Sequence, residues 1–274
     1  MNNELLNLLD PVIAIAEQAG KAIVPYFAQD RLLKVQHKMD CTLVTEADIA
    51  AQAIIKTELQ KLTVHYPIVS EEDQQWEEYA IRKEWSRYWL VDPLDGTKGF
   101  VNHLPEFSVN IALIENNAPI LGVIYGPMTQ ICYYAAFEQG AYKKQHGIIK
   151  RLHGAVFNPN NPRIILGQYH QSRQFLELFQ GKSFQLLRMN SSLKFGCLAE
   201  GSADIYPRFG PTSEWDTAAG QCLLHEIGGI VVDFAGQSLQ YNAKPSLLNP
   251  KFIALSDRSA LKFLKPFFTG EKSA

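Results

Sequence analysis

Cysteine is scarce in this chain of 274 residues, which contains only four, at positions 41, 132, 197 and 222. No two of them form a Cys-x-x-Cys pair, and their scattered spacing argues against both a zinc site and a disulfide framework. The pattern is instead typical of reduced thiols in a cytosolic protein.

Long apolar runs and net charge are also lacking. No hydrophobic stretch approaches the roughly 20 residues that a membrane-spanning helix needs, and the N-terminal Met-Asn-Asn-Glu-Leu-Leu has neither region of a signal peptide. The formal net charge is −2, which argues against a nucleic-acid polymer as partner but leaves a single nucleotide open as a ligand. We expect a cytoplasmic protein, with peripheral attachment to the cytoplasmic face of the inner membrane left open.

Hydrophobic residues make up 46% of the chain, enough for a large core and for two subdomains. Apolar spacing predicts helices over residues 4–28 and 48–62. Strands and turns between residues 88 and 143 predict a largely antiparallel sheet with these two helices packed on it. Residues 147–162, rich in Asn, Pro, Gly and basic residues, are predicted to be a linker. Beyond them strands and helices alternate, which favours a second sheet of parallel character.

The most informative segment is residues 91–97, Val-Asp-Pro-Leu-Asp-Gly-Thr. The apolar run before it predicts a buried strand, and Pro93 cannot continue a central ladder, so the backbone is expected to turn there. Asp92 and Asp95 can then point at one place, where two carboxylates repel each other unless one is protonated. A hard cation such as Mg²⁺ removes that conflict. An acidic surface turn is the commoner interpretation of such a pair. A metal site is therefore expected only if other carboxylates join Asp92 and Asp95.

Gly96 and Thr97 follow these carboxylates directly. Glycine lets backbone approach a ligand closely. Thr97 places a hydroxyl and an N–H at the expected start of a helical turn, which is a natural anion site. Metal ligands and a phosphate cradle are therefore predicted side by side.

Three other acidic segments are candidates for the same cluster. In the first, a strand again ends in carboxylates, and we expect Glu71 to bind metal while Glu72 and Asp73 form a solvated turn. In the second, Asp216 precedes a helix of small residues, where it is an N-cap, a metal ligand or both. In the third, Asp48 lies in the first turn of a predicted helix and has the same two interpretations.

Together these segments resemble the inositol monophosphatase superfamily of Mg²⁺-dependent, lithium-sensitive phosphatases. The resemblance covers nearly the whole chain and implies an α/β (α+β) fold, a layered αβαβα sandwich. An N-terminal α+β subdomain over 1–150 would carry an antiparallel sheet and most metal ligands. A C-terminal α/β subdomain over 151–274 would carry Asp216 and substrate-binding residues. The blocks that carry the resemblance are 44–48, 70–73, 89–100 and 215–220.

Within the superfamily the chain most resembles the 3′(2′),5′-bisphosphate nucleotidases of the CysQ type. Lys98 follows the Asp-Gly-Thr block, and residues 190–195 and 206–211 match the nucleotidase pattern and supply Lys194 and Arg208. A second phosphate needs such cations. The alternatives are a solvated helix lysine for Lys194 and a surface ion pair for Arg208.

The chain departs from the family pattern at three places. Residues 40–43 read Asp-Cys-Thr-Leu where Asp-Asn-Ser-Pro is usual, and Gly99 stands where bacterial members usually have Glu. Residues 168–170 read Gln-Tyr-His near the usual Ser-Arg-Ser-His. His170 is a candidate substrate contact, although a lone histidine at a strand end is more often structural or solvated.

The resemblance implies two or three Mg²⁺ ions, two of them bridged by Asp92. The Thr97 hydroxyl, oriented by Asp48 and assisted by Glu71, would accept a proton from the attacking water. The implied metal ligands are Glu71, Asp92, the Leu94 carbonyl, Asp95 and Asp216. The implied catalytic residues are Asp48, Glu71 and Thr97. The implied substrate contacts are Glu71, Leu94, Asp95, Gly96, Thr97, His170, Ser191, Lys194, Arg208 and Asp216.

The implied reaction is hydrolysis of the 3′-phosphate of adenosine 3′,5′-bisphosphate to AMP and phosphate, with the 5′-phosphosulfate relative as a further substrate and a role in sulfur metabolism. The main alternative is another phosphatase of the superfamily, acting on inositol phosphate or fructose 1,6-bisphosphate, against which Lys98, Lys194 and Arg208 argue. The second alternative is a non-catalytic Mg²⁺- or nucleotide-binding protein on this fold, and the presence of Asp48 and Thr97 argues against it. The sequence is compatible with a monomer and with a homodimer.

Overall fold

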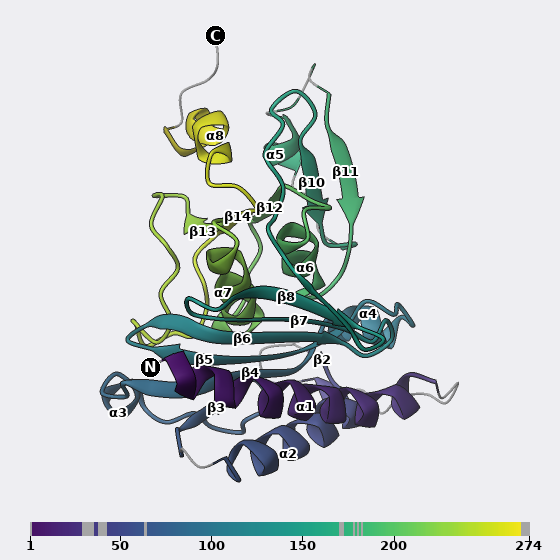
Figure 1. Cartoon of the computed structure of the whole chain (residues 1–274), viewed down its shortest axis with the longest axis vertical. Helices are drawn as coiled ribbons and strands as arrows, with labels where there is room; N and C mark the ends of the chain where they lie inside the picture. The colour runs from purple at the N-terminus through teal and green to yellow at the C-terminus, as the bar shows by residue number, and fades with distance from the viewer. Residues whose placement is uncertain are drawn as a thin grey trace.

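The computed structural model describes residues 2–28, 36–37, 43–62, 65–169, 173–177, 179, 181 and 183–269. The elements stack in layers (Figure 1): two helices, a seven-stranded sheet, two further helices, a five-stranded sheet, and outer helices. The predicted layered αβαβα sandwich is confirmed. No helix in these residues is long and apolar enough to cross a membrane.

The first layer consists of α1 (Asn2–Phe27) and α2 (Glu46–Leu59), close to the predicted ranges. Their apolar faces pack on the seven-stranded sheet in one buried cluster. Helix α2 begins after Thr45, whose extended backbone and side chain form a capping box with Asp48. A short pair, β1 (Gln36–His37) and β2 (Leu43–Val44), lies between the two helices in the sequence.

The seven-stranded sheet is antiparallel except for its first pair, so the predicted antiparallel character is confirmed. The predicted linker over 147–162 is partly wrong, because its start is strand β9, which turns back on β8 at Gly147, where φ is +78°. All four β9 side chains are exposed, so no apolar alternation marks this edge strand. The strands are β3 (Ile68–Ser70), β4 (Arg87–Asp95), β5 (Ser108–Glu115), β6 (Ala118–Gly126), β7 (Ile131–Ala136), β8 (Gly140–Gln145) and β9 (Ile148–Arg151).

The sequence predicted that the backbone turns at Pro93. This is wrong, because strand β4 continues to Asp95. The pairing with β5 shifts register between Asp92, which faces Asn110, and Asp95, which faces Ser108. The irregularity accommodates a proline that has no N–H to donate. It also keeps both aspartates on the rigid sheet.

The five-stranded sheet is mixed, in the order β11-β10-β12-β14-β13. Only β10 pairs in parallel, with β11 and β12, so the expected parallel character holds for half of this sheet. The chain passes to it after β9, and the division into subdomains 1–150 and 151–274 stays a prediction. The strands are β10 (Arg163–Leu166), β11 (Gln185–Arg188), β12 (Ile205–Arg208), β13 (Ile230–Asp233) and β14 (Phe252–Leu255).

Helices α6 (Leu193–Ala199) and α7 (Ala218–Glu226) lie between the two sheets (Figure 1). Helix α7 approaches β6 so closely that a Cβ on Gly122 would lie 2.6 Å from the Ala219 carbonyl oxygen. The small residues at the start of α7 therefore allow the helix to sit directly on the sheet. The remaining helices are α3 (Tyr79–Arg82), α4 (Thr97–Val101), α5 (Arg173–Glu177), α8 (Ala260–Thr269) and the 3₁₀ turn η1 (Glu214–Asp216).

Candidate active site

Two parallel strands bring Glu71 and Asp92 together. Ser70 pairs with Val91, so β3 and β4 reach the same edge of the sheet. The Glu71 N–H donates to the Val91 carbonyl at 3.1 Å, which extends the pairing by one residue. Asp216 arrives from η1, far along the sequence. One carboxylate oxygen from each of Glu71, Asp92 and Asp216 lies within 4.8 Å of the others, so three of the predicted ligands converge.

Asp92 is the most deeply buried carboxylate of this cluster. Its side chain is 1% exposed, and its Oδ1 accepts the Leu94 N–H at 3.0 Å. Its Oδ2 is buried and has no hydrogen-bond partner among the described residues. Burial, then the charges of Glu71 and Asp95, raises the pKa of Asp92 well above its usual value. A buried carboxylate oxygen without a donor is costly, and a divalent cation among these oxygens would satisfy it.

Asp216 caps a turn, but not the one expected. Its Oδ2 accepts the Ser213 N–H at 2.9 Å, while Thr217 occupies the N-cap of α7. The interpretation of Asp216 as the N-cap of α7 is wrong because the 3₁₀ turn η1 comes first, with Asp216 as its third residue. Burial, then the charge of Asp95, raises the pKa of Asp216 to about 7.

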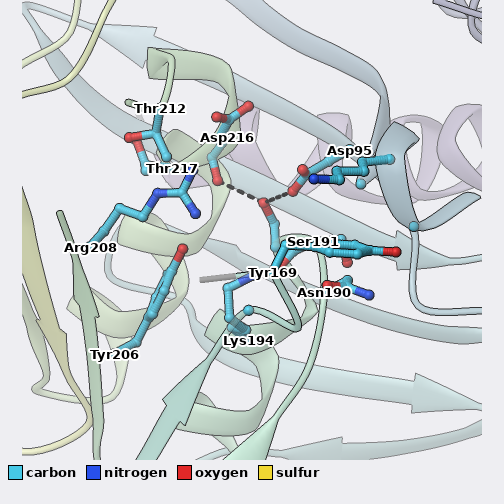
Figure 2. A pocket seen from close by; sticks show the side chains of 15 residues that line it. Asp95, Tyr169, Asn190, Ser191, Lys194, Tyr206, Arg208, Thr212, Asp216 and Thr217 are labelled. Carbon is cyan, nitrogen blue, oxygen red and sulfur yellow. Dashed lines mark hydrogen bonds between the residues drawn. The ribbon is translucent and has the colours of Figure 1, made fainter. Parts of the chain in front are cut away.

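Asp95 borders the cluster and is joined to Asp216 through a serine. Ser192 Oγ lies 2.5 Å from Asp95 Oδ2 and 2.7 Å from the Asp216 carbonyl oxygen, along the dashed lines in Figure 2. Asn110 Nδ2 donates to the same Ser192 oxygen at 3.0 Å. Sequence reasoning singled out Ser191 and missed Ser192 and Asn110. The signal for Asn110 was an amide side chain inside an otherwise apolar strand.

Asp48 serves helix capping and the site together. Its Oδ2 accepts the Thr45 N–H at 2.8 Å and the Thr45 hydroxyl at 2.6 Å. Its Oδ1 lies 3.5 Å from the Thr97 hydroxyl, which is closer to the Leu94 carbonyl oxygen, at 3.1 Å. Burial raises the pKa of Asp48 to about 6, although hydrogen bonds from Thr45 oppose the rise.

The expectation that Glu72 and Asp73 form a solvated turn is wrong. Glu72 is only 9% exposed, and its charge contributes to the raised pKa of Asp48. Asp73 is largely covered, accepts the Ser70 N–H at 3.1 Å and pairs with Lys56 at 2.6 Å. The turn packs against α2, and sequence alone gave no sign of that contact.

Gly96 is required by backbone geometry. Its φ is +93°, in the left-handed region, and α4 begins at the next residue. A Cβ here would lie 3.3 Å from both the Glu106 carbonyl oxygen and the Ser191 side chain. Glycine therefore lets the turn bring Thr97 beside the carboxylates.

A cavity of about 270 Å³ adjoins the carboxylates and has a cationic wall (Figure 2). Lys194 is 5% exposed, donates to the Ser191 carbonyl and lies 5.0 Å over the Tyr206 ring. Burial lowers the pKa of Lys194 to about 8, although Asp95 opposes the fall. Arg208 donates to the carbonyl oxygens of Gly210 and Pro211, at 3.3 and 2.7 Å. The alternative of a solvated Lys194 is wrong.

The predicted substrate contacts divide into three groups. One group lines the cavity, whereas Glu71, Leu94 and Thr97 lie on the carboxylate side, outside its lining. His170 lies outside the described residues. The predicted contacts that line the cavity are Asp95, Gly96, Ser191, Lys194, Arg208 and Asp216.

The chain belongs to the inositol monophosphatase family, whose sequence profile matches residues 4–263. It is 43% identical to the 3′(2′),5′-bisphosphate nucleotidase CysQ of Salmonella typhimurium over 247 residues, 89% of this chain and 98% of the relative. The crystal structure of CysQ from Bacteroides thetaiotaomicron is similar, with a TM-score of 0.79, 34% identity and coverage of 93% and 98%. The IMPase of Thermotoga maritima matches with a TM-score of 0.76 and 26% identity over 97% of this chain and 99% of that one.

Proposed function

We propose that this member of the inositol monophosphatase family is a Mg²⁺-dependent 3′(2′),5′-bisphosphate nucleotidase. It hydrolyses the 3′-phosphate of adenosine 3′,5′-bisphosphate to AMP and phosphate, and it also accepts the 5′-phosphosulfate relative. The observation that carries the proposal is one cavity with carboxylates at one end and two cations, Lys194 and Arg208, on its wall. The nucleotidases at 43% identity support the same substrate class.

The carboxylate cluster fits a pair or trio of Mg²⁺ ions. Asp92 Oδ2 is a buried acceptor that no described donor satisfies, and all the candidate ligands are the hard oxygens that Mg²⁺ prefers. When bound, the ions supply positive charge at the entering and leaving oxygens and lower the pKa of water. The proposed ligands are Glu71, Asp92, the Leu94 carbonyl, Asp95 and Asp216.

Thr97 and Asp48 move the proton of the attacking water. Thr97 Oγ1 accepts that proton and passes its own to Asp48 Oδ1, 3.5 Å away, with Glu71 helping to hold the water. The water oxygen bonds to phosphorus as the bond to the 3′-oxygen breaks, and the leaving oxygen takes a proton from solvent. The backbone N–H groups of Gly96 and Thr97 hold the phosphoryl group in line.

The cationic wall holds the second phosphate. Lys194 is buried with its charge directed at a backbone carbonyl and an aromatic face, and Arg208 is bound to two carbonyl oxygens. Both cations are therefore held before a ligand arrives, which lowers the entropy lost on binding. A monophosphate leaves this wall without a partner. Ser191 and His170 complete the proposed contacts.

The test is phosphate release from adenosine 3′,5′-bisphosphate, from inositol 1-phosphate and from fructose 1,6-bisphosphate, each with Mg²⁺ and then with added Li⁺ or Ca²⁺. We expect a clear preference for the nucleotide and inhibition by Li⁺. Preference for the inositol ester or for fructose 1,6-bisphosphate would assign the chain to the sugar phosphatases of the family instead. Asp92→Asn protein, assayed in parallel, controls for contaminating phosphatases.

We place this activity in the cytoplasm, within sulfur metabolism, where it would recycle nucleotides left by sulfate transfer. Fractionation of cells that express the chain tests the location, and recovery with the inner membrane would indicate peripheral attachment. Light scattering of the purified protein distinguishes the monomer from the homodimer.

A further inference from the structure

The rim of the cavity is built differently from its interior. Two tyrosines contribute to the lining, but Tyr206 is 5% exposed whereas Tyr169 is 42% exposed. In Figure 2, Arg208 and Tyr206 lie on the left, and Tyr169 is drawn close to Ser191 and Asn190. Because Tyr169 is exposed and also lines the cavity, its ring stands at the mouth.

Tyr169 is held in place from two sides. The Lys98 ammonium lies 4.4 Å from the centroid of its ring, a distance at which a cation and an aromatic face attract each other. The preceding residue is also fixed, because the Gln168 N–H donates to Asn190 Oδ1 at 3.2 Å. Asn190 is itself buried and lines the cavity. A ring that is exposed and yet positioned is suited to contact a ligand.

The size of the cavity decides which part of a nucleotide reaches this ring. Its volume of about 270 Å³ lies below the roughly 300–1,000 Å³ of pockets that enclose whole drug-sized ligands. With one phosphate at the carboxylates and the other between Lys194 and Arg208, the phosphates and the sugar fill the interior. The base then has to lie at the mouth, beside Tyr169.

We propose that Tyr169, positioned by Lys98 and Asn190, is the platform on which the base of a nucleotide stacks. This rests on the proposed function and identifies the part of that site that selects a nucleotide over a base-free phosphate ester. Stacking on an aromatic ring tolerates different bases, because every base offers a π-face. Tyr169 therefore selects for the presence of a base rather than for its identity.

The experiment compares the KM of wild type and Tyr169→Ala for adenosine 3′,5′-bisphosphate, guanosine 3′,5′-bisphosphate and methyl riboside 3,5-bisphosphate, which has no base. We expect Tyr169→Ala to raise KM about 5- to 100-fold for both nucleotides, the range of one lost base–aromatic contact. The kcat changes little, and KM for the base-free ester stays the same. Tyr169→Phe keeps the ring and is expected to match the wild type.

Tyr79→Ala is the matched control, because Tyr79 also faces a cation, Arg82 at 5.6 Å, but does not line the cavity. It should leave all three KM values unchanged. Two outcomes for Tyr169→Ala would show that the base does not stack on Tyr169. One is an equal rise in KM for the base-free ester, and the other is no rise in KM for the nucleotides.

Calorimetric binding of adenosine 3′,5′-bisphosphate in EDTA separates this proposal from the proposed function. If the wild type releases no phosphate from the nucleotide, the proposed function fails. The ratio of the dissociation constants of the wild type and Tyr169→Ala then tests by itself whether the base stacks on Tyr169. Weaker binding by Tyr169→Ala than by the wild type supports this stacking, and equal binding overturns it.

Discussion

The two sides of the cavity handle charge in opposite ways. On the carboxylate side, Glu71, Asp92 and Asp216 bring like charges within 4.8 Å of one another, and Asp92 Oδ2 has no donor among the described residues. On the cationic side, Lys194 and Arg208 already donate to backbone carbonyls. One side is unfavourable until a cation enters, whereas on the other side backbone carbonyls already hold both cations before any ligand arrives.

This difference follows from where the residues come from. Glu71 follows directly after β3, whereas Asp92 stands on β4 and Asp216 on η1. Tertiary packing brings these three segments together, so the repulsion between their carboxylates is imposed by the fold. The cations stand on α6 and β12 beside the carbonyl groups of their own neighbours. We infer that metal binding and folding are coupled on the carboxylate side, and that the cationic side mainly selects the substrate.

The largest expected effect comes from Asp92→Asn on the carboxylate side. Removing this charge should lower kcat about 10²- to 10⁴-fold, because several kcal/mol of charge stabilisation at the reacting phosphate is lost. The melting temperature in EDTA should not fall, since Asp92 is a carboxylate that burial already disfavours. The increase in melting temperature on adding Mg²⁺ should shrink.

Glu226→Gln is the matched control for Asp92→Asn. This carboxylate accepts the N–H groups of Glu138 and Gly140 at 3.0 and 2.7 Å and does not line the cavity. Its replacement should leave kcat and the Mg²⁺-dependent stabilisation unchanged. Full activity of Asp92→Asn would show that the two sides of the cavity do not differ as described.

A smaller effect is expected from Lys194→Met on the cationic side. Losing one charged partner of the second phosphate should raise KM for adenosine 3′,5′-bisphosphate about 10- to 100-fold. KM for 3′-AMP, which lacks that phosphate, should change little. Lys143→Met is the control, because Lys143 lies 5.6 Å from the Tyr133 ring but outside the cavity. Equal losses for both substrates would place Lys194 on the reacting phosphate instead.

The sequence predicted the first two helices and the carboxylates well because both are local patterns, whereas the order of the layers was implied by the family resemblance. Helical periodicity gave α1 and α2, and carboxylates at strand ends gave Glu71 and Asp92. Burial of Glu72, by contrast, depends on how its turn packs against α2, and the position of Ser192 between Asp95 and Asp216 depends on three distant segments. No local pattern reports such contacts. The edge strand β9 was missed because exposed side chains leave no alternation.

A further effect, on stability, follows from the raised pKa values on the carboxylate side. The folded protein keeps a proton on Asp216 up to about pH 7, and on Asp48 up to about pH 6, whereas the unfolded chain loses both near pH 4. Because the folded state binds more protons in that window, its stability falls as pH rises through it. In EDTA, the melting temperature should drop by roughly 5 °C between pH 5.5 and 7.5.

Saturating Mg²⁺ should remove most of this pH dependence, because the metal replaces the protons. Asp216→Asn in EDTA should show a shallower slope than the wild type, since one of the titrating groups is gone. A slope that neither Mg²⁺ nor Asp216→Asn alters would have to arise from groups outside the cluster.

The smallest expected effect concerns Trp76, which ties together the two segments that carry Glu71 and Asp216. Its Nε1 donates to the Ser70 carbonyl at 2.7 Å, and its ring centroid lies 5.3 Å from that of Trp215. Trp76→Phe keeps the ring contact but loses the hydrogen bond. This should weaken Mg²⁺ binding about 2- to 10-fold in calorimetry.

The melting temperature of Trp76→Phe in EDTA should hardly change, because Trp76 is 39% exposed and little apolar area is lost. Trp85→Phe, which alters a ring packed on Tyr88 at 6.1 Å, is the control and should bind Mg²⁺ like the wild type. If both variants bind Mg²⁺ equally well, the Trp76 hydrogen bond does not help to hold the carboxylates in place. A selective loss in Trp76→Phe would instead show that the hydrogen bond from Trp76 to the Ser70 carbonyl helps to hold the carboxylates of the two segments together.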